Sequence, residues 1–141
     1  MRFLLDTNVL SETMRASPNR RLVARLSQHE GQYGISAVTW QELAFGIRRL
    51  PDGRRKEALA ARLAELPDVL PPILPFTVEA ADWLGTELAR LESKGRAVSC
   101  EDGQIAATAW ASNLVLVTAN TKHFSVFRDL KVTDWTRGSR R

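Results

Sequence analysis

Three acidic residues, Asp6, Glu42 and Asp102, stand where strands and helices are expected to meet. Asp6 directly follows the apolar run from Phe3 to Leu5, and a carboxylate at the end of a buried strand is costly to desolvate unless a positive charge compensates it. Converging carboxylates repel each other unless a hard cation lies among them, and such oxygen ligands suit Mg²⁺ or Mn²⁺. The chemistry indicated is attack of a metal-activated water on a phosphodiester bond.

Each of these acids also has a structural explanation. Asp6 can cap a turn or a helix, as Asp residues after strands commonly do. Thr39 and Glu42 have the spacing of a capping box, in which Glu42 serves its own helix. Asp102 lies three residues after Ser99 and also fits a cap, but it heads an apolar stripe on its own helix, so capping explains it least well.

Five polar residues near the strand ends are further candidates. Asn120 can bind a cation through its carbonyl oxygen or orient a bound water, although a loop-forming Asn is the simpler explanation. His123 is expected to be structural, because two histidines in the whole chain do not favour a zinc site. Thr7, Asn8 and Thr118 are expected to donate hydrogen bonds to the cation's ligands.

The elements that must position these residues alternate between strands and helices. Apolar periodicity predicts strands at 3–5, 33–36, 73–76, 114–118 and 130–133. Five helices are predicted. The first begins with Ser17 as cap and Pro18 as first residue, the second begins at Thr39, and the third runs through Leu59, Leu63 and Leu66. The fourth follows the cap Thr77 and ends at Gly95, and the fifth follows the cap Ser99. This alternation predicts a three-layer α/β domain with a mostly parallel sheet of four to five strands, whose carboxyl edge is the place for a ligand.

The composition indicates one globular unit. The chain has 141 residues and is 44% hydrophobic, enough for a single core and no second one. No apolar run approaches the roughly 20 residues of a membrane span, and the start of the chain lacks a signal peptide's apolar stretch, so we expect a cytoplasmic protein without membrane contact. Cys100 is the only cysteine, and we expect it to pack in the core.

The charge of the chain is moderately basic. Twenty Lys and Arg residues against 16 Asp and Glu give a net charge of +4, which permits a polyanionic partner without requiring one. Three of the positive charges, Arg137, Arg140 and Arg141, lie in a C-terminal stretch without an apolar pattern. We therefore predict a single domain over residues 1–135 and a basic tail over 136–141 that can be disordered.

Four segments in order resemble the PIN domains of the VapC and FitB type. They are LLDTNVLSE, SAVTWQELAFGI, EDGQIAATAWA and LVLVTANTKHF, and they are followed by Asp134 and Trp135, so that the similarity covers nearly the whole chain. The resemblance implies a PIN-like α/β/α sandwich and an Mg²⁺-dependent endoribonuclease, with Asp6, Glu42 and Asp102 as the family's first three acids.

The same resemblance implies partners. It implies the toxin of a toxin–antitoxin pair, with RNA as substrate, a cognate antitoxin that blocks the site, and a toxin homodimer. These components can join a larger assembly that binds DNA through the antitoxin.

One departure from the family pattern leaves two rival interpretations open. Many members have a fourth acid in the segment where this chain has Asn120, so the fourth ligand can be Asn120 or water. The substitution supports a second hypothesis, a nuclease-like protein with weak turnover that acts by binding its antitoxin or nucleic acid. An aspartyl-nucleophile phosphatase is disfavoured, because that chemistry needs a second acid two residues after Asp6 and this chain has Asn8 there.

Overall fold

The computed structural model describes residues 1–69 and 71–138, apart from the side chains of residues 66–69. Within that part of the chain there are five strands, β1 (Phe3–Leu5), β2 (Tyr33–Ser36), β3 (Ile73–Leu74), β4 (Val115–Val117) and β5 (Val132–Thr133). The helices are α1 (Thr7–Thr13), α2 (Arg20–Gln28), α3 (Ala37–Arg48), α4 (Arg54–Val69), α5 (Val78–Ser93), α6 (Cys100–Ala111) and α7 (Thr121–Phe124).

The strands form one parallel sheet with β1 in its centre. Their order is β3-β2-β1-β4-β5, and every neighbouring pair is parallel. The chain adds β2 and β3 on one side of β1 and then crosses to add β4 and β5 on the other. The strand order therefore reverses between β1 and β4, and in open α/β sheets ligands bind outside the carboxyl ends of the strands at such a point.

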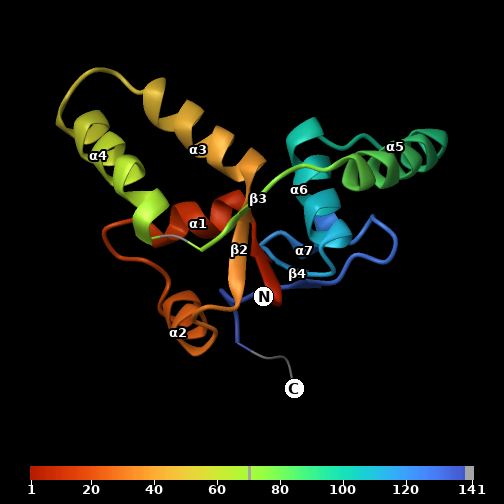
Figure 1. Cartoon of the computed structure of the whole chain (residues 1–141), viewed down its shortest axis with the longest axis horizontal. Coiled ribbons are helices and arrows are strands. Elements are labelled where there is room, and N and C mark those ends of the chain that lie inside the picture. The colour runs from red at the N-terminus through yellow and green to blue at the C-terminus, as the bar shows by residue number, and fades with distance from the viewer. Residues whose placement is uncertain (70, 139–141) are drawn as a thin grey trace.

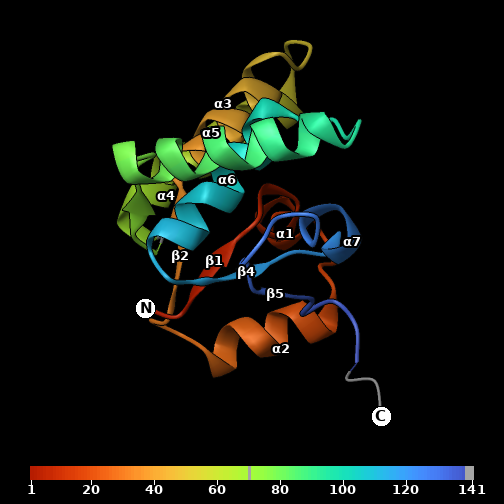
Figure 2. The same ribbon diagram turned by 90° about the vertical axis from the view of Figure 1, so that its right-hand side faces the viewer.

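Two apolar cores cover the two faces of this sheet. Leu4 packs into one core with residues of α5 and α6, whereas Phe3 and Leu5 pack into the other with residues of α1, α2, α3 and α4. Figure 1 shows α1, α3 and α4 on one side of the strands and α5 and α6 on the other, and Figure 2 shows α2 below the sheet. The predicted three-layer sandwich with a parallel sheet is confirmed.

The predicted ends of the elements hold in the second half of the chain. Thr77 caps α5 by accepting a hydrogen bond from the Ala80 N–H, and Ser99 caps α6 in the same way from Asp102. Gly95 lies just past α5 with φ of +70°, the left-handed conformation that favours glycine. The last three strands are shorter than predicted, and the predicted helix through Leu59 and Leu63 is α4.

The predicted starts of two helices are wrong. The cap of α2 is Asn19, which accepts from the Leu22 N–H, so Ser17 and Pro18 lie outside that helix. The cap of α3 is Ser36, three residues before Thr39, because the helix begins as soon as β2 ends. Thr39 is buried inside α3, and the predicted capping box with Glu42 does not form.

The structure bears on the expectations for Cys100, the C-terminal tail and membrane contact. Cys100 is exposed at the first position of α6, so its predicted packing in the core is wrong. The predicted tail begins in contact with the body, since the Asn19 side-chain amide donates to the Thr136 carbonyl at 3.3 Å. Arg140, Arg141 and the side chain of Leu66 lie outside the described residues. Within the described part, no helix combines the length and apolar character needed to cross a membrane.

Candidate active site

Asp6 lies at the carboxyl end of β1 and is the residue around which the site is built. Its side chain is 3% exposed, and it caps α1, a helix that the sequence patterns did not reveal. Oδ1 accepts a hydrogen bond of 2.8 Å from the Thr7 N–H, and Oδ2 accepts one of 3.0 Å from the Thr118 hydroxyl. The capping explanation of Asp6 is therefore correct, yet one of its oxygens is also tied to the end of β4.

The environment of Asp6 is unfavourable for a negative charge. Burial raises the pKa of its carboxyl from 3.8 to about 6, although the hydrogen bonds from Thr118 and Thr7 act in the opposite direction. The negative charges of Asp102 and Glu42 raise the pKa further. Glu42 and Asp102 thus both act electrostatically on Asp6, and a cation among the three acids would relieve this repulsion.

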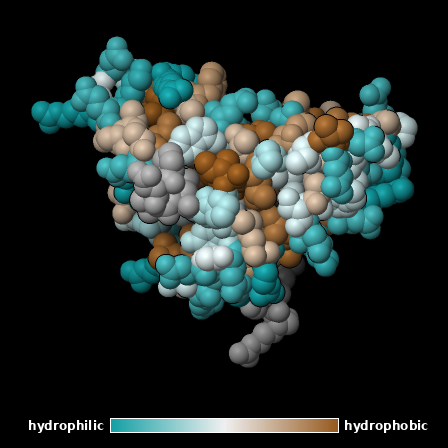
Figure 3. Space-filling model, in the orientation of Figure 1, coloured by the Kyte–Doolittle hydropathy of each residue, from teal (hydrophilic) through white to brown (hydrophobic). Residues whose placement is uncertain are grey.

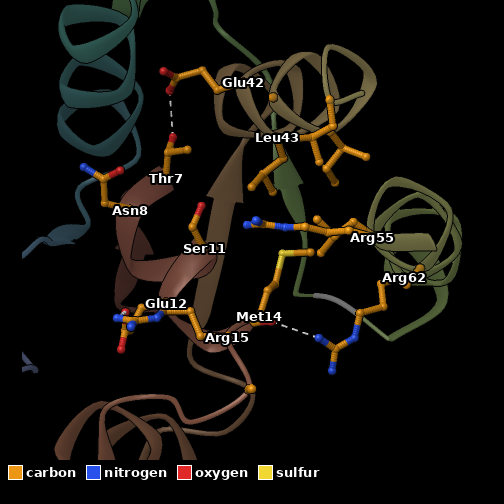
Figure 4. Close-up of a pocket in the computed structure, with 16 residues that line it drawn as sticks. Thr7, Asn8, Ser11, Glu12, Met14, Arg15, Glu42, Leu43, Arg55 and Arg62 are labelled. Carbon is orange, nitrogen blue, oxygen red and sulfur yellow. Dashed lines mark hydrogen bonds and ion pairs between the residues drawn. The ribbon is translucent and has the colours of Figure 1, made fainter. Parts of the chain in front are cut away.

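Glu42 is held by the first residue of α1. The Thr7 hydroxyl donates a hydrogen bond to Glu42 Oε1 at 2.7 Å (Figure 4). It also lies 3.0 Å from Thr39 Oγ1, from which it can accept a hydrogen bond. Because Ser36 caps α3, Glu42 is not needed at the helix start. Its side chain is instead directed to α1, where Asp6 is the cap, and Thr7 donates a hydrogen bond to one of the three candidate ligands.

Asp102 lies in the first turn of α6 and contacts a histidine. Its backbone N–H donates to the Ser99 hydroxyl, and its Oδ2 lies 2.8 Å from Nε2 of His123 on α7. The sequence patterns indicated a purely structural His123, and this contact with a candidate ligand was missed. The available signal was that His123 lies three residues after Asn120, another candidate ligand.

Asn120 follows β4 and marks the start of α7. Its backbone N–H donates to the Thr118 hydroxyl at 3.0 Å, the same hydroxyl that donates to Asp6. Asn120 is exposed, and its side chain makes no capping hydrogen bond. The side-chain carbonyl oxygen of Asn120 therefore does not cap α7.

The oxygen donors around Asp6 have the chemistry that a divalent cation requires, although they form no closed cage. Among the described residues, no group of three or more His, Cys, Asp and Glu side chains is arranged so that it could hold a metal ion. Mg²⁺ does not require such a cage, because it keeps several waters and is usually bound through one or two carboxylates. The carboxylates of Asp6, Glu42 and Asp102 are the hard oxygen donors it prefers, and Asp6 is costly to ionise without it. In their chemistry, these residues fit Mg²⁺ or Mn²⁺.

A groove of about 870 Å³ leads away from this cluster between α1, α3 and α4. Apolar side chains of the three helices form much of its lining, namely Met14, Leu43, Ile47, Leu50 and Leu59. Thr7 and Glu42 lie at one end, and Arg15, Arg55 and Arg62 supply positive charge. Figure 4 shows Arg55 extending from α4 toward α1, while Arg62 donates to the Met14 carbonyl at 2.9 Å. The sequence patterns gave no sign of this groove.

Known proteins are similar to this chain in sequence and in fold. Residues 3–130 match the model of the PIN domain family. The VapC ribonuclease Y4jK of Sinorhizobium fredii is 35% identical over 86% of this chain and 89% of its own length. The tRNA(fMet)-specific endonuclease VapC of Shigella flexneri is 31% identical over 96% of this chain and 99% of its own. A chain in the structure of FitAB bound to an IR36 DNA fragment superposes with a TM-score of 0.85, 32% identity and 98% coverage of each chain.

Proposed function

The chain belongs to the PIN domain family, and we propose that it is a ribonuclease, the toxin of a toxin–antitoxin pair. The observation that supports this best is that Glu42 and Asp102 both lie near enough to the buried Asp6 carboxyl, at the carboxyl end of β1, for their charges to act on it. The similarity to proteins named as VapC ribonucleases supports the choice of RNA as substrate. An enzyme of this kind acts in the cytoplasm, where its substrate is.

We propose that Asp6, Asp102 and Glu42 hold Mg²⁺, for which Mn²⁺ can substitute, and that the Asn120 carbonyl oxygen is available as a fourth donor. When bound, the cation supplies charge neutralisation for the phosphodiester and acidifies a water. The protein's part is to hold the donors. Thr7 and Thr118 fix the two oxygens of Asp6, and Thr7 also fixes Glu42.

Glu42 is the acid best placed to receive a proton from the attacking water. It lines the groove between α1, α3 and α4, whereas Asp6 is almost fully buried. The described residues give this carboxylate one hydrogen bond, to Oε1, which leaves Oε2 for the cation or its water. A carboxylate with one anchored and one unanchored oxygen keeps its orientation while it accepts the proton.

The groove provides a place for the antitoxin. An extended protein segment with apolar side chains could cover its apolar lining, and acidic side chains would meet Arg15, Arg55 and Arg62. Such a segment would also cover Glu42 at the end of the groove and so block the site. The likeness to a FitAB chain solved with DNA supports the further proposal that the pair binds DNA through the antitoxin.

We also propose that the toxin forms a homodimer. Phe45 on α3, Ile73 on the edge strand β3 and Val78 at the start of α5 are exposed apolar side chains. Figure 3 shows apolar residues gathered along the centre of the face across which β3 and the chain leading to α5 run. A second copy that covers such a face would remove the apolar surface from water.

The test is RNA cleavage by the purified chain with and without Mg²⁺. We expect cleavage to require the cation, and both Asp6→Asn and Asp102→Asn to abolish it while the proteins stay folded. Asp82→Asn, which removes an exposed carboxylate from α5, serves as the control and should cleave like the wild type. Unchanged cleavage by Asp6→Asn would contradict the proposed site.

The second candidate is a protein that binds without turnover, and Asn120 in place of an acid is the observation that favours it. The same assay separates the two functions. A binding protein would retain RNA in a filter-binding experiment at every Mg²⁺ concentration and release no products.

A further inference from the structure

We propose that His123 is the positioning residue for Asp102, and that it fixes this carboxylate for the cation. The inference rests on the proposed function, since it concerns the same acidic cluster. Nε2 of His123 lies 2.8 Å from Oδ2 of Asp102, although the two residues belong to different helices, α7 and α6.

The other two acids, Asp6 and Glu42, are oriented by hydrogen bonds from threonines, and Asp102 would have no such partner among the described side chains without His123. The two oxygens of Asp6 accept hydrogen bonds from Thr7 and Thr118, and Glu42 accepts one from Thr7. Asp102 lies in the first turn of α6, and the hydrogen bond to the Ser99 hydroxyl is made by its backbone N–H and not by its carboxylate. Within the described residues, His123 is the side chain that bonds the Asp102 carboxylate, so each of the three acids has at least one partner that fixes its orientation.

The short helix α7 holds the His123 ring in place. The adjacent Phe124 is 1% exposed in the core, and the two rings meet edge to face with centroids 5.2 Å apart. At the other end of α7, the Asn120 N–H donates to the Thr118 hydroxyl beside Asp6. One segment of seven residues, Thr118 to Phe124, therefore contacts Asp6 at its start and Asp102 near its end.

The chemistry of the pair fixes the direction of the hydrogen bond. An ionised carboxylate can only accept, so Nε2 of His123 must carry the proton and donate it. With Oδ2 held in this way, Oδ1 is left for the cation. A histidine here adds no negative charge to the three carboxylates, in contrast to a fourth acid, and so orients a ligand without adding to the repulsion.

Two substitutions separate this role from simple packing. His123→Phe keeps a ring beside Phe124 but has no N–H, whereas His123→Gln loses the ring and keeps an amide N–H at similar reach. We expect His123→Phe to weaken Mn²⁺ binding by roughly 10-fold or more, the usual effect of removing a partner of a metal ligand, and His123→Gln to restore most of it. Lys122→Arg, an exposed neighbour on the same helix, should bind like the wild type.

The measurement is titration of the full chain with Mn²⁺ alone, followed by the electron paramagnetic resonance signal of the free ion. Equal affinities of wild type and His123→Phe, or a loss with His123→Gln alone, would overturn the inference in favour of packing. Nitrogen-15 NMR of the wild type provides a readout that needs no variant of His123, because the proposal requires the Nε2–H form. His29→Gln assigns the signals, since His29 is the only other histidine. A bare Nε2 would also overturn the inference.

These readouts distinguish the inference from the proposed function. If the wild type binds Mn²⁺ but cleaves no RNA, the ribonuclease proposal fails, while the ranking of the variants still tests His123. If the wild type cleaves RNA and His123→Phe binds Mn²⁺ equally well, only the role of His123 is refuted.

Discussion

The Thr118 hydroxyl donates a hydrogen bond of 3.0 Å to Asp6 Oδ2, although the two residues are 112 positions apart in the chain. Thr118 follows β4 and Asp6 follows β1, so the bond spans the point where the strand order reverses. It stabilises the ionised form of a carboxyl whose burial favours the protonated one. The ends of the two strands are therefore matched to keep one acid in the state that binds a cation.

Thr118→Val should raise the pKa of Asp6 above its value of about 6, because valine keeps the shape of threonine but has no donor. The measurement is a carbon-13 NMR titration of the carboxyl groups in the presence of a chelator. Thr118→Ser keeps the hydroxyl and is expected to titrate like the wild type. An unchanged pKa in the valine variant would mean that this hydrogen bond does not stabilise the ionised form.

The contribution of Asp6 to the stability of the cation-free protein should fall as the pH rises from about 4 to about 6. The folded state holds the Asp6 proton more tightly than the unfolded chain does, so folding is favoured below the unfolded pKa of 3.8 and this advantage is lost through about 6. Asp6→Asn should remove this dependence and raise the free energy of unfolding at pH 7 by roughly 2–3 kcal/mol. Urea unfolding in EDTA at a series of pH values measures both effects.

Added Mg²⁺ should make the wild type more stable than Asp6→Asn, the reverse of their order in EDTA. A ligand that binds only the folded state stabilises it, so the wild type gains with Mg²⁺ concentration and Asp6→Asn does not. Equal gains by both proteins would show that the cation binds elsewhere.

Sequence patterns predicted which residues lie at the carboxyl edge of the sheet, but they did not predict the side-chain contacts that these residues make. Asp6 and Thr118 each end a short apolar run, and parallel strands place such ends at one edge, so their closeness followed from the alternation of elements. Glu42 was open to a second explanation because Thr39 and Glu42 have capping-box spacing, whereas Ser36 at the end of β2 is the actual cap. His123 and Asp102 meet only because α7 turns back toward α6, which no local pattern reports.

Glu87 should be important for stability although it lies outside the site. This buried carboxylate on α5 accepts hydrogen bonds from Arg90 Nε at 2.8 Å and from the Arg128 N–H at 2.6 Å, and Arg90 donates to the Val126 carbonyl. The hydrogen bond from Arg90 holds the Glu87 pKa below its usual value. Glu87→Ala leaves these donors without their acceptor and should lower the Tm at pH 7 by several degrees.

The pH dependence of the Tm, measured by calorimetry, shows whether the lost charge of Glu87 causes the destabilisation of Glu87→Ala. Because the pKa of Glu87 is lowered in the folded state, its contribution is present at neutral pH and is lost as the pH falls, so the two proteins should converge in acid. Glu92→Ala, an exposed position on the same helix, is the control. A difference in Tm that stays constant with pH would point to lost packing instead of the lost charge.

Gly46→Leu should separate antitoxin binding from folding. Gly46 lines the groove between α1, α3 and α4, and a Cβ there would meet no atom within 4 Å apart from its chain neighbours and its own helix backbone, so a side chain at this position has room to enter the groove. Leucine is a better helix former than glycine by roughly 0.5–1 kcal/mol, so the Tm should rise. If the groove receives the antitoxin, affinity for the cognate antitoxin should fall at least about 10-fold, which corresponds to about 1.4 kcal/mol. Gly85→Leu on α5 has equal space and the same gain in helix propensity away from the groove, and equal affinities of the two variants would rule out the groove as the antitoxin site.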